Sequence, residues 1–154
     1  MRRNTLTEHD ARLGLLGKLF RSRRTKRRGA AVVEFAVVAP VFFLLIFGMI
    51  EYGRLVMVQQ VLTNASREGA RVGVLDGSTK SDVTTAVNNY LSSAKITGST
   101  LTVTPDPPSS AAYGAPVTIT VSVPFTKVSW LPSPMFLGGT TVTATSVMRR
   151  ESVQ

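Results

Sequence analysis

The sequence predicts an α+β protein. A long N-terminal transmembrane helix would continue into an amphipathic helix and pack, outside the membrane, with a second helix and a small antiparallel β-sheet. Three observations predict this fold: an apolar run of membrane length, helical spacing of apolar residues after it, and strand-like alternation in the C-terminal half. We expect a basic cytoplasmic leader over 1–29, a transmembrane helix over 30–50, its extension outside the membrane over 51–76, and a small α+β domain over 77–154.

Positive charge is concentrated in the leader. The chain has a net charge of +9; residues 1–29 hold ten Lys or Arg and two acids, and the remainder holds eight and seven. Basic residues beside a membrane helix stay in the cytoplasm, so we expect a single pass through the cytoplasmic membrane with the C-terminal domain outside. The same rule explains the charge better than nucleic-acid binding does. The leader is either a basic amphipathic helix on the inner leaflet or a disordered tail, since Gly14 and Gly17 weaken a helix.

The apolar run extends from Ala30 to Ile50, with Glu34 as its only charge. These 21 residues would form a helix of about 31 Å, enough to cross the hydrocarbon core of a bilayer. A cleaved signal peptide normally has a shorter apolar core and a small-x-small cleavage site, so a retained anchor in the lipid bilayer fits better. Pro40 should kink the helix or remove one backbone hydrogen bond.

Helical spacing continues beyond the apolar run, and the long helix is predicted to extend from Ala30 to about Val74, with a turn over 76–78. A second helix is predicted after it, with Ser81 as the N-cap and Gly98 as the stop. Its apolar face repeats at helical intervals through Val83, Ala86, Val87, Tyr90, Leu91 and Ala94.

Three segments alternate as strands do: Leu101–Thr104, Val117–Val123 and Thr140–Met148. Such alternation is typical of an antiparallel sheet with one buried face. The second connection contains the unusually apolar stretch Trp130–Leu137. This stretch either folds back over a small core or forms an exposed patch for a partner or the membrane surface.

The sequence offers few groups for chemistry. His9 is the only histidine, in the leader and across the membrane from the domain, and cysteine is absent. No Ser-His-Asp arrangement and no zinc site can therefore form outside, and no Gly-rich phosphate loop follows a strand. We expect no enzymatic activity, no catalytic residue, no cofactor and no metal.

Glu34 has two interpretations. It lies near the start of the membrane helix and could reach the headgroups. Alternatively, if the chain were cut after Gly29, Ala30 would carry a free α-amine, and Glu34 would lie one turn along to neutralise it in its own or a neighbouring subunit. A buried charge pair of this kind would set subunits in register during assembly.

A dense polar patch follows on the outer part of the helix, comprising Arg67, Glu68, Gly69 and Arg71. A solvated face explains it, and a docking surface is the alternative. Gly69 and Gly73 are spaced as a small-x-x-x-small pair, which permits close helix approach.

These residues together resemble the TadE-like family of tight-adherence (Flp) pilus assembly proteins. The resemblance rests on Arg27–Ala36, Pro40, Gly48, Glu51–Arg54 and Asn64–Arg71. It implies a minor pilin or pseudopilin made as a precursor, inserted with its N-terminus inside, and cut by a membrane aspartic prepilin peptidase.

Carried onto this chain, the resemblance places the cleavage between Gly29 and Ala30 and makes Glu34 the acid at the fifth mature position. It implies as partners the prepilin peptidase, the major pilin and other pseudopilins, the inner-membrane platform proteins and a cytoplasmic ATPase. Two hypotheses stand: a cleaved pseudopilin serving pilus assembly, adhesion or secretion, and an unprocessed single-pass anchor whose outer domain binds a ligand or surface.

Overall fold

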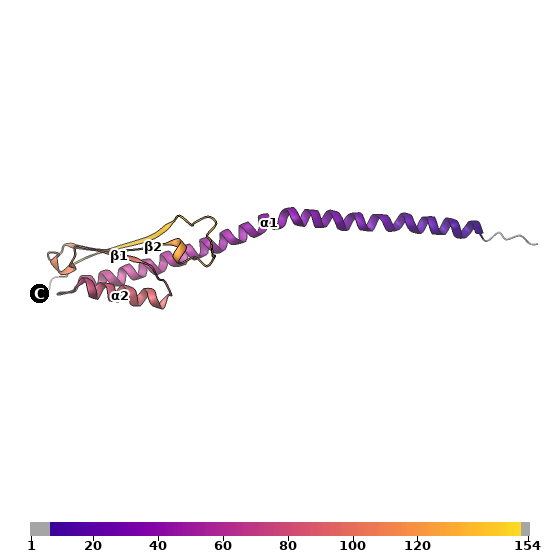
Figure 1. The fold of residues 1–154 in the computed structure, drawn as a ribbon. Coiled ribbons are helices and arrows are strands. Elements are labelled where there is room, and N and C mark those ends of the chain that lie inside the picture. The colour runs from indigo at the N-terminus through magenta and orange to yellow at the C-terminus, as the bar shows by residue number, and fades with distance from the viewer. Residues whose placement is uncertain (1–6, 152–154) are drawn as a thin grey trace, which may run out of the picture. The chain divides into compact units, whose positions relative to one another are not determined.

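The structure is a computed structural model that describes the backbone of residues 7–151 and the side chains of residues 29–151. Within this part of the chain the fold is α+β, as predicted (Figure 1). The elements in order are α1 (Thr7–Gly73), α2 (Lys80–Ser93), β1 (Thr100–Thr104), η1 (Pro108–Ser110), β2 (Pro116–Pro124), η2 (Phe125–Lys127) and β3 (Thr141–Arg149). The chain divides into two compact units, one ending at Ile46 and the other beginning at Phe47.

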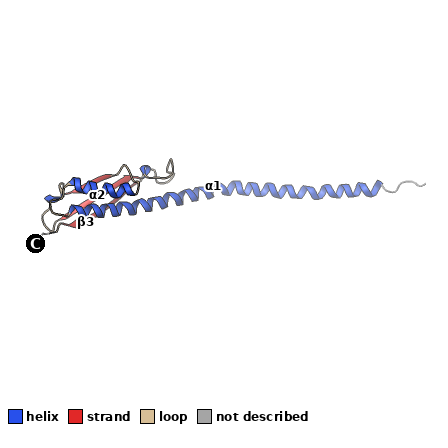
Figure 2. Ribbon diagram, turned by 90° about the horizontal axis from the view of Figure 1, so that it is seen from below, coloured by secondary structure: helices blue, strands red, loops and turns tan. Residues whose placement is uncertain are grey.

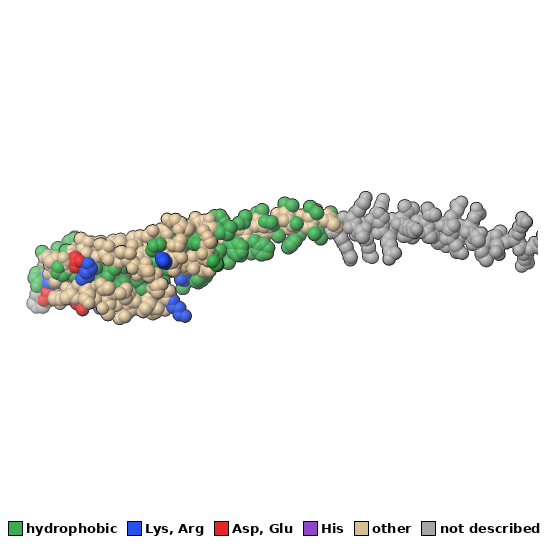
Figure 3. All heavy atoms as spheres, in the orientation of Figure 1, with side chains coloured by type: hydrophobic (Ala, Val, Ile, Leu, Met, Phe, Trp, Pro, Cys, Tyr) green, Lys and Arg blue, Asp and Glu red, His purple; other side chains and the backbone are tan. Residues whose placement is uncertain are grey.

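The apolar run lies within α1. Among the described residues, one helix is long and apolar enough to cross a membrane, Gly29–Gly73, and its most apolar window has a mean hydropathy of 2.6 with no buried residue. Figure 3 shows hydrophobic side chains over the surface of this helix. Apolar side chains exposed all round a helix are typical of a lipid-facing segment. Pro40 lies inside the helix, which continues through it with one backbone donor fewer.

α1 begins earlier than predicted, at Thr7 instead of Ala30. The backbone is therefore helical through most of the leader, because two glycines weaken a helix by only about 1 kcal/mol each and no proline interrupts it. A helix lying on the inner leaflet stays a prediction. The side chains of the basic leader and residues 1–6 lie outside the described part. At its other end α1 stops at Gly73, one residue before the predicted Val74.

The sheet has the order β1-β2-β3 with both pairings antiparallel. In the register, Val103 of β1 faces Ile119 of β2, which faces Ser146 of β3. Residues of the central strand alternate between buried and half-buried, so one face is apolar and the other carries hydroxyl groups. Figures 1 and 2 show α2 and the C-terminal part of α1 side by side over one face of the sheet.

The core of the second unit lies between the two helices and the sheet. Its largest contributions come from α1 (Val58, Leu62, Ala65 and Ala70), from Val74 just after α1, from α2 (Val83, Val87 and Leu91) and from β2 (Val117, Ile119, Val121 and Val123). The extension of α1 beyond the apolar run is therefore an integral part of the outer domain, which explains why the second unit begins as early as Phe47.

α2 begins two residues earlier than the prediction of Ser81 as N-cap. Thr79 caps it: the Thr79 hydroxyl accepts from the Asp82 amide at 3.3 Å, and the Thr79 amide donates to the Asp82 carboxylate at 2.9 Å. This reciprocal capping box satisfies two helix-end donors, which a cap at Ser81 would leave to water.

α2 also ends earlier than the predicted stop at Gly98. Lys95 takes the left-handed conformation with φ 55°, and the amides of Lys95 and Ile96 donate back to the carbonyls of Ser92 and Leu91 at 3.0 Å each. This is a Schellman cap in which a lysine replaces the usual glycine, and Ile96 is buried behind it.

Candidate functional site

The predicted cleavage segment lies on the first turns of the apolar part of α1. Gly29, Ala30 and Glu34 are all exposed, and no other part of the described chain lies within 4 Å of where a Cβ on Gly29 would be. Positions 30 and 34 are one helical turn apart and share a face. The side chain of Glu34 is therefore placed next to the position that an α-amine on Ala30 would occupy.

The predicted docking patch separates into two parts. The Glu68 carboxylate accepts two hydrogen bonds from Arg71, at 2.6 Å from Nη2 and 2.9 Å from Nε. These bonds lower the pKa of Glu68 and raise the pKa of Arg71. Arg67 is exposed, as is Arg71, and Glu68 is half-buried. These three residues lie on the surface of the outer domain.

Gly69, the remaining residue of the patch, faces the core. A Cβ there would lie 2.6 Å from Val87 Cγ2 and 3.2 Å from Ile119 Cγ2, and one on Gly73 would lie 3.3 Å from Val117. The two glycines therefore let α1 approach α2 and β2 of the same chain. The spacing of Gly69 and Gly73 does indicate close packing of α1, and the elements packed against it belong to the same chain.

Sequence reasoning used Glu51 only as part of the family resemblance and assigned it no role, yet its side chain is buried, with the residue 1% exposed. Its carboxylate accepts hydrogen bonds from the backbone amides of Phe136, at 3.1 and 3.4 Å, and of Leu137, at 3.1 Å. A carboxylate one residue beyond an apolar run was the available signal. Its partners could not be inferred, because they are backbone groups 85 and 86 residues away.

Arg54, three positions further along α1, is a second buried charged residue that binds the backbone of the loop. Its Nε donates to the carbonyl of Val128 at 2.7 Å, and its guanidinium lies 4.9 Å from the centre of the Trp130 ring. Burial lowers the pKa of Arg54, since it removes the charged form from water. An arginine stays protonated through such a shift, so the pair with the aromatic ring keeps its cation–π character.

Glu51 and Arg54 together hold the loop between η2 and β3 against α1, and we refer to them as the loop clamp. The apolar stretch Trp130–Leu137 of this loop is partly packed and partly exposed. Val128 is buried in the core, and Leu137 packs against it. Trp130, Met135 and Phe136 are exposed, each by more than half of its surface.

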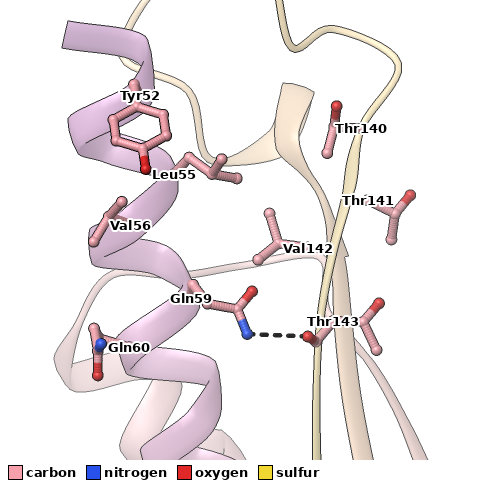
Figure 4. A pocket seen from close by; sticks show the side chains of 9 residues that line it. All are labelled: Tyr52, Leu55, Val56, Gln59, Gln60, Thr140, Thr141, Val142 and Thr143. Atoms are coloured by element: carbon pink, nitrogen blue, oxygen red, sulfur yellow. Dashed lines mark hydrogen bonds between the residues drawn. The ribbon is translucent and has the colours of Figure 1, made fainter. Parts of the chain in front are cut away.

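A groove of about 390 Å³ runs between α1 and β3 (Figure 4). It is lined by Tyr52, Leu55, Val56, Gln59 and Gln60 of α1 and by Thr140, Thr141, Val142 and Thr143. Gln59 Nε2 donates to the Thr143 carbonyl at 3.1 Å, so the helix satisfies one acceptor of the edge strand. The lining is uncharged. Among the described residues no three His, Asp or Glu side chains come together as a metal site would need.

The described part of the chain is thus a small α+β domain carried on an N-terminal apolar helix that is compatible with a single-pass membrane anchor. Residues 29–71 match the family model described as TadE-like protein, which confirms the resemblance noted in the sequence. The match begins at Gly29 and ends at Arg71, so it covers the apolar run and the part of α1 that packs in the outer domain. No curated protein and no solved structure gives a match to this chain.

Proposed function

We propose that this protein is a minor pilin or pseudopilin that takes part in assembling a tight-adherence (Flp-type) pilus, or a related surface adhesion or secretion system. The observation that carries the proposal is the match over residues 29–71 to the TadE-like family, in a helix of membrane length with an exposed acid five residues past a glycine. The protein acts as a structural subunit in this proposal, with no catalytic role of its own.

The first step is processing by a prepilin peptidase between Gly29 and Ala30, on the cytoplasmic side of the membrane. This bond lies inside α1, so the helix must unwind locally before a peptidase can cut it. A glycine at this position lowers the barrier, because it weakens a helix by about 1 kcal/mol relative to alanine. Cleavage removes the basic leader, which has by then fixed the N-terminus in the cytoplasm.

The second step uses the charge pair between the new α-amine of Ala30 and the carboxylate of Glu34. An unpaired charge inside the apolar run is penalised, and pairing removes part of that penalty. When the amine of one subunit meets the Glu34 of another, the pair also fixes the axial register of the two helices.

The outer domain then contacts the major pilin, other pseudopilins or the platform proteins of the inner membrane. Arg67, Glu68 and Arg71 are the surface residues of the matched segment that we assign to this docking. Gly69 supports them from inside by packing α1 on α2.

An alternative function is an unprocessed single-pass anchor whose extracytoplasmic domain binds a ligand. The observation that favours it is the uncharged groove between α1 and β3 (Figure 4), which is lined by hydroxyl, amide and apolar side chains. Cleavage after Gly29 distinguishes the two functions, since only the pseudopilin needs it.

Glu34→Ala and Glu34→Asp, compared in cells that carry the pilus machinery, test the assembly role. Membrane insertion should be unchanged for both, because replacing one acid leaves the apolar run intact. Surface piliation should be lost in Glu34→Ala and retained in part in Glu34→Asp, which keeps the charge. Normal piliation in Glu34→Ala would contradict the charge-pair mechanism.

A further inference from the structure

Exposed apolar and aromatic side chains gather around one level of α1, where its apolar run ends. On the helix they are Met49, 68% exposed, and Tyr52, 65% exposed. On the loop between η2 and β3 they are Trp130, Met135 and Phe136, exposed by 64%, 53% and 61%. Large exposed side chains gathered in this way mark a surface that contacts something apolar.

The loop is held firmly at this level. The Phe136 ring lies 3.5 Å from where a Cβ on Gly48 would be, and the Phe136 amide donates to Glu51. Arg54 lies under the Trp130 ring and binds the backbone two residues before it. Helix residues 48, 51 and 54 thus set the position of the loop along α1.

Chain continuity identifies what lies beside the loop. The apolar run of α1 ends at Ile50, so the edge of the hydrocarbon core falls near this residue if the helix spans the membrane. Side chains at residues 48–54 and those packed against them then lie at headgroup depth. Trp and Tyr are enriched at this depth because their rings are apolar and their N–H and O–H groups are polar.

The charge of the loop agrees with this position. From Val128 to Thr140 there is no Asp, Glu, Lys or Arg. Tyr113 is a second exposed aromatic residue that an arginine contacts. It precedes β2, whereas Trp130 follows β2. The two ends of β2, a strand of nine residues, are about 30 Å apart. Tyr113, at the end opposite Trp130, therefore lies far from the level of Ile50.

We propose that the loop Trp130–Leu137 is a membrane foot, which seats Trp130, Met135 and Phe136 in the headgroup–acyl boundary of the leaflet from which α1 emerges. The occupant of this surface is the lipid bilayer. Glu51 and Arg54 are positioning residues that hold the foot at the right depth. The inference rests on the membrane anchoring in the proposed function, and it adds that the domain stands on the bilayer at a fixed height instead of pivoting freely.

The full chain in nanodiscs of phosphatidylethanolamine and phosphatidylglycerol provides the test. Trp130 is the only tryptophan, so its fluorescence reports on the foot alone. We expect strong quenching by lipids brominated near the top of the acyl chain and weak quenching by acrylamide in the water. Met135→Ser combined with Phe136→Ser should reduce the quenching by brominated lipid, with hydrogen exchange of β2 unchanged as the check on folding.

The matched control combines Trp130→Phe with Tyr113→Trp, which moves the single tryptophan to the far end of β2. Its quenching by acrylamide should be high, and its quenching by brominated lipid should be at least about twofold lower than that of Trp130.

Two outcomes would overturn the membrane foot. One is a Trp130 that acrylamide quenches as readily as the control and that brominated lipid does not quench. The other is a Trp130 that is shielded only in discs holding two or more copies, without quenching by lipid, which would assign the surface to a second copy of the chain. Processing at Gly29 in cells is measured separately, so the foot can fail while the proposed function stands.

Discussion

Replacing Gly69 with alanine should loosen the outer domain, because no space is left for the added methyl group. A Cβ at Gly69 would lie 2.6 Å from Val87 Cγ2, closer than real Cβ contacts, and 3.2 Å from Ile119 Cγ2. Overpacking of this kind costs about 1–3 kcal/mol, and the higher helix propensity of alanine returns up to about 1 kcal/mol. We expect a net loss of about 1–2 kcal/mol in the free energy of unfolding of the domain.

Two other glycines of α1 serve as controls for the same substitution. At Gly73 the nearest atoms would lie 3.3 and 3.4 Å away, so Gly73→Ala should be close to neutral. At Gly53 nothing lies within 4 Å, so Gly53→Ala should stabilise the helix by up to about 1 kcal/mol. The order of stability should therefore be Gly53→Ala, then Gly73→Ala, then Gly69→Ala.

The order of stability of the three variants can be measured by amide hydrogen exchange of β2, followed by mass spectrometry on the full chain in detergent. Fluorescence is less suitable, since Trp130 is exposed in the loop between η2 and β3 and lies outside the core. A loss of 1–2 kcal/mol corresponds to exchange about 5–30 times faster. Unchanged exchange in Gly69→Ala, or equally fast exchange in Gly53→Ala, would refute the intramolecular packing of Gly69 and return it to the docking surface.

Three further changes test other contacts. Arg150 donates to the carbonyls of Ser109 and Ala111 and to Asp76, so Arg150→Met should lower the unfolding free energy by about 2–3 kcal/mol in denaturant titrations; no change would show that these bonds contribute nothing. The hydrogen bonds from Thr79 lower the pKa of Asp82, so the stability they give is present above the unfolded pKa of about 3.9 and lost as pH falls through the lower folded pKa. Thr79→Ala should therefore destabilise the domain in melts at pH 7, with a smaller difference at strongly acidic pH, and a difference independent of pH would argue against the capping box. Replacing Glu68 and Arg71 together with glutamine removes a solvent-exposed pair and should leave the melting temperature nearly unchanged while reducing pilus assembly; full assembly would remove these residues from the docking surface.

The main elements could be predicted from local patterns. The alternation of Val117–Val123 and the apolar run from Ala30 to Ile50 carry strong periodic signals, and both appear in the structure as β2 and as part of α1. The helix ends were harder to predict. Thr79 and Ser81 are both good N-cap residues, and the choice depends on which of them forms the reciprocal bonds with Asp82.

The candidate site was predictable only where it is local in sequence. Gly29, Ala30 and Glu34 form one short segment, and their order on a helix follows from spacing alone. The loop clamp was not predictable, because Glu51 and Arg54 bind backbone groups more than 70 residues away. The direction of Gly69 likewise depends on where α2 packs, which periodicity within α1 does not reveal.

The N-terminus of the mature protein tests the central claim most directly. The chain would be expressed with its own prepilin peptidase, purified from membranes, and its first residue read by intact mass and by sequencing. A Gly29→Val variant, which removes the glycine before the cut, is the matched control and should keep its leader. The account predicts that the protein begins at Ala30. A protein that keeps its leader in the presence of an active peptidase would contradict the proposed pseudopilin and favour the unprocessed anchor.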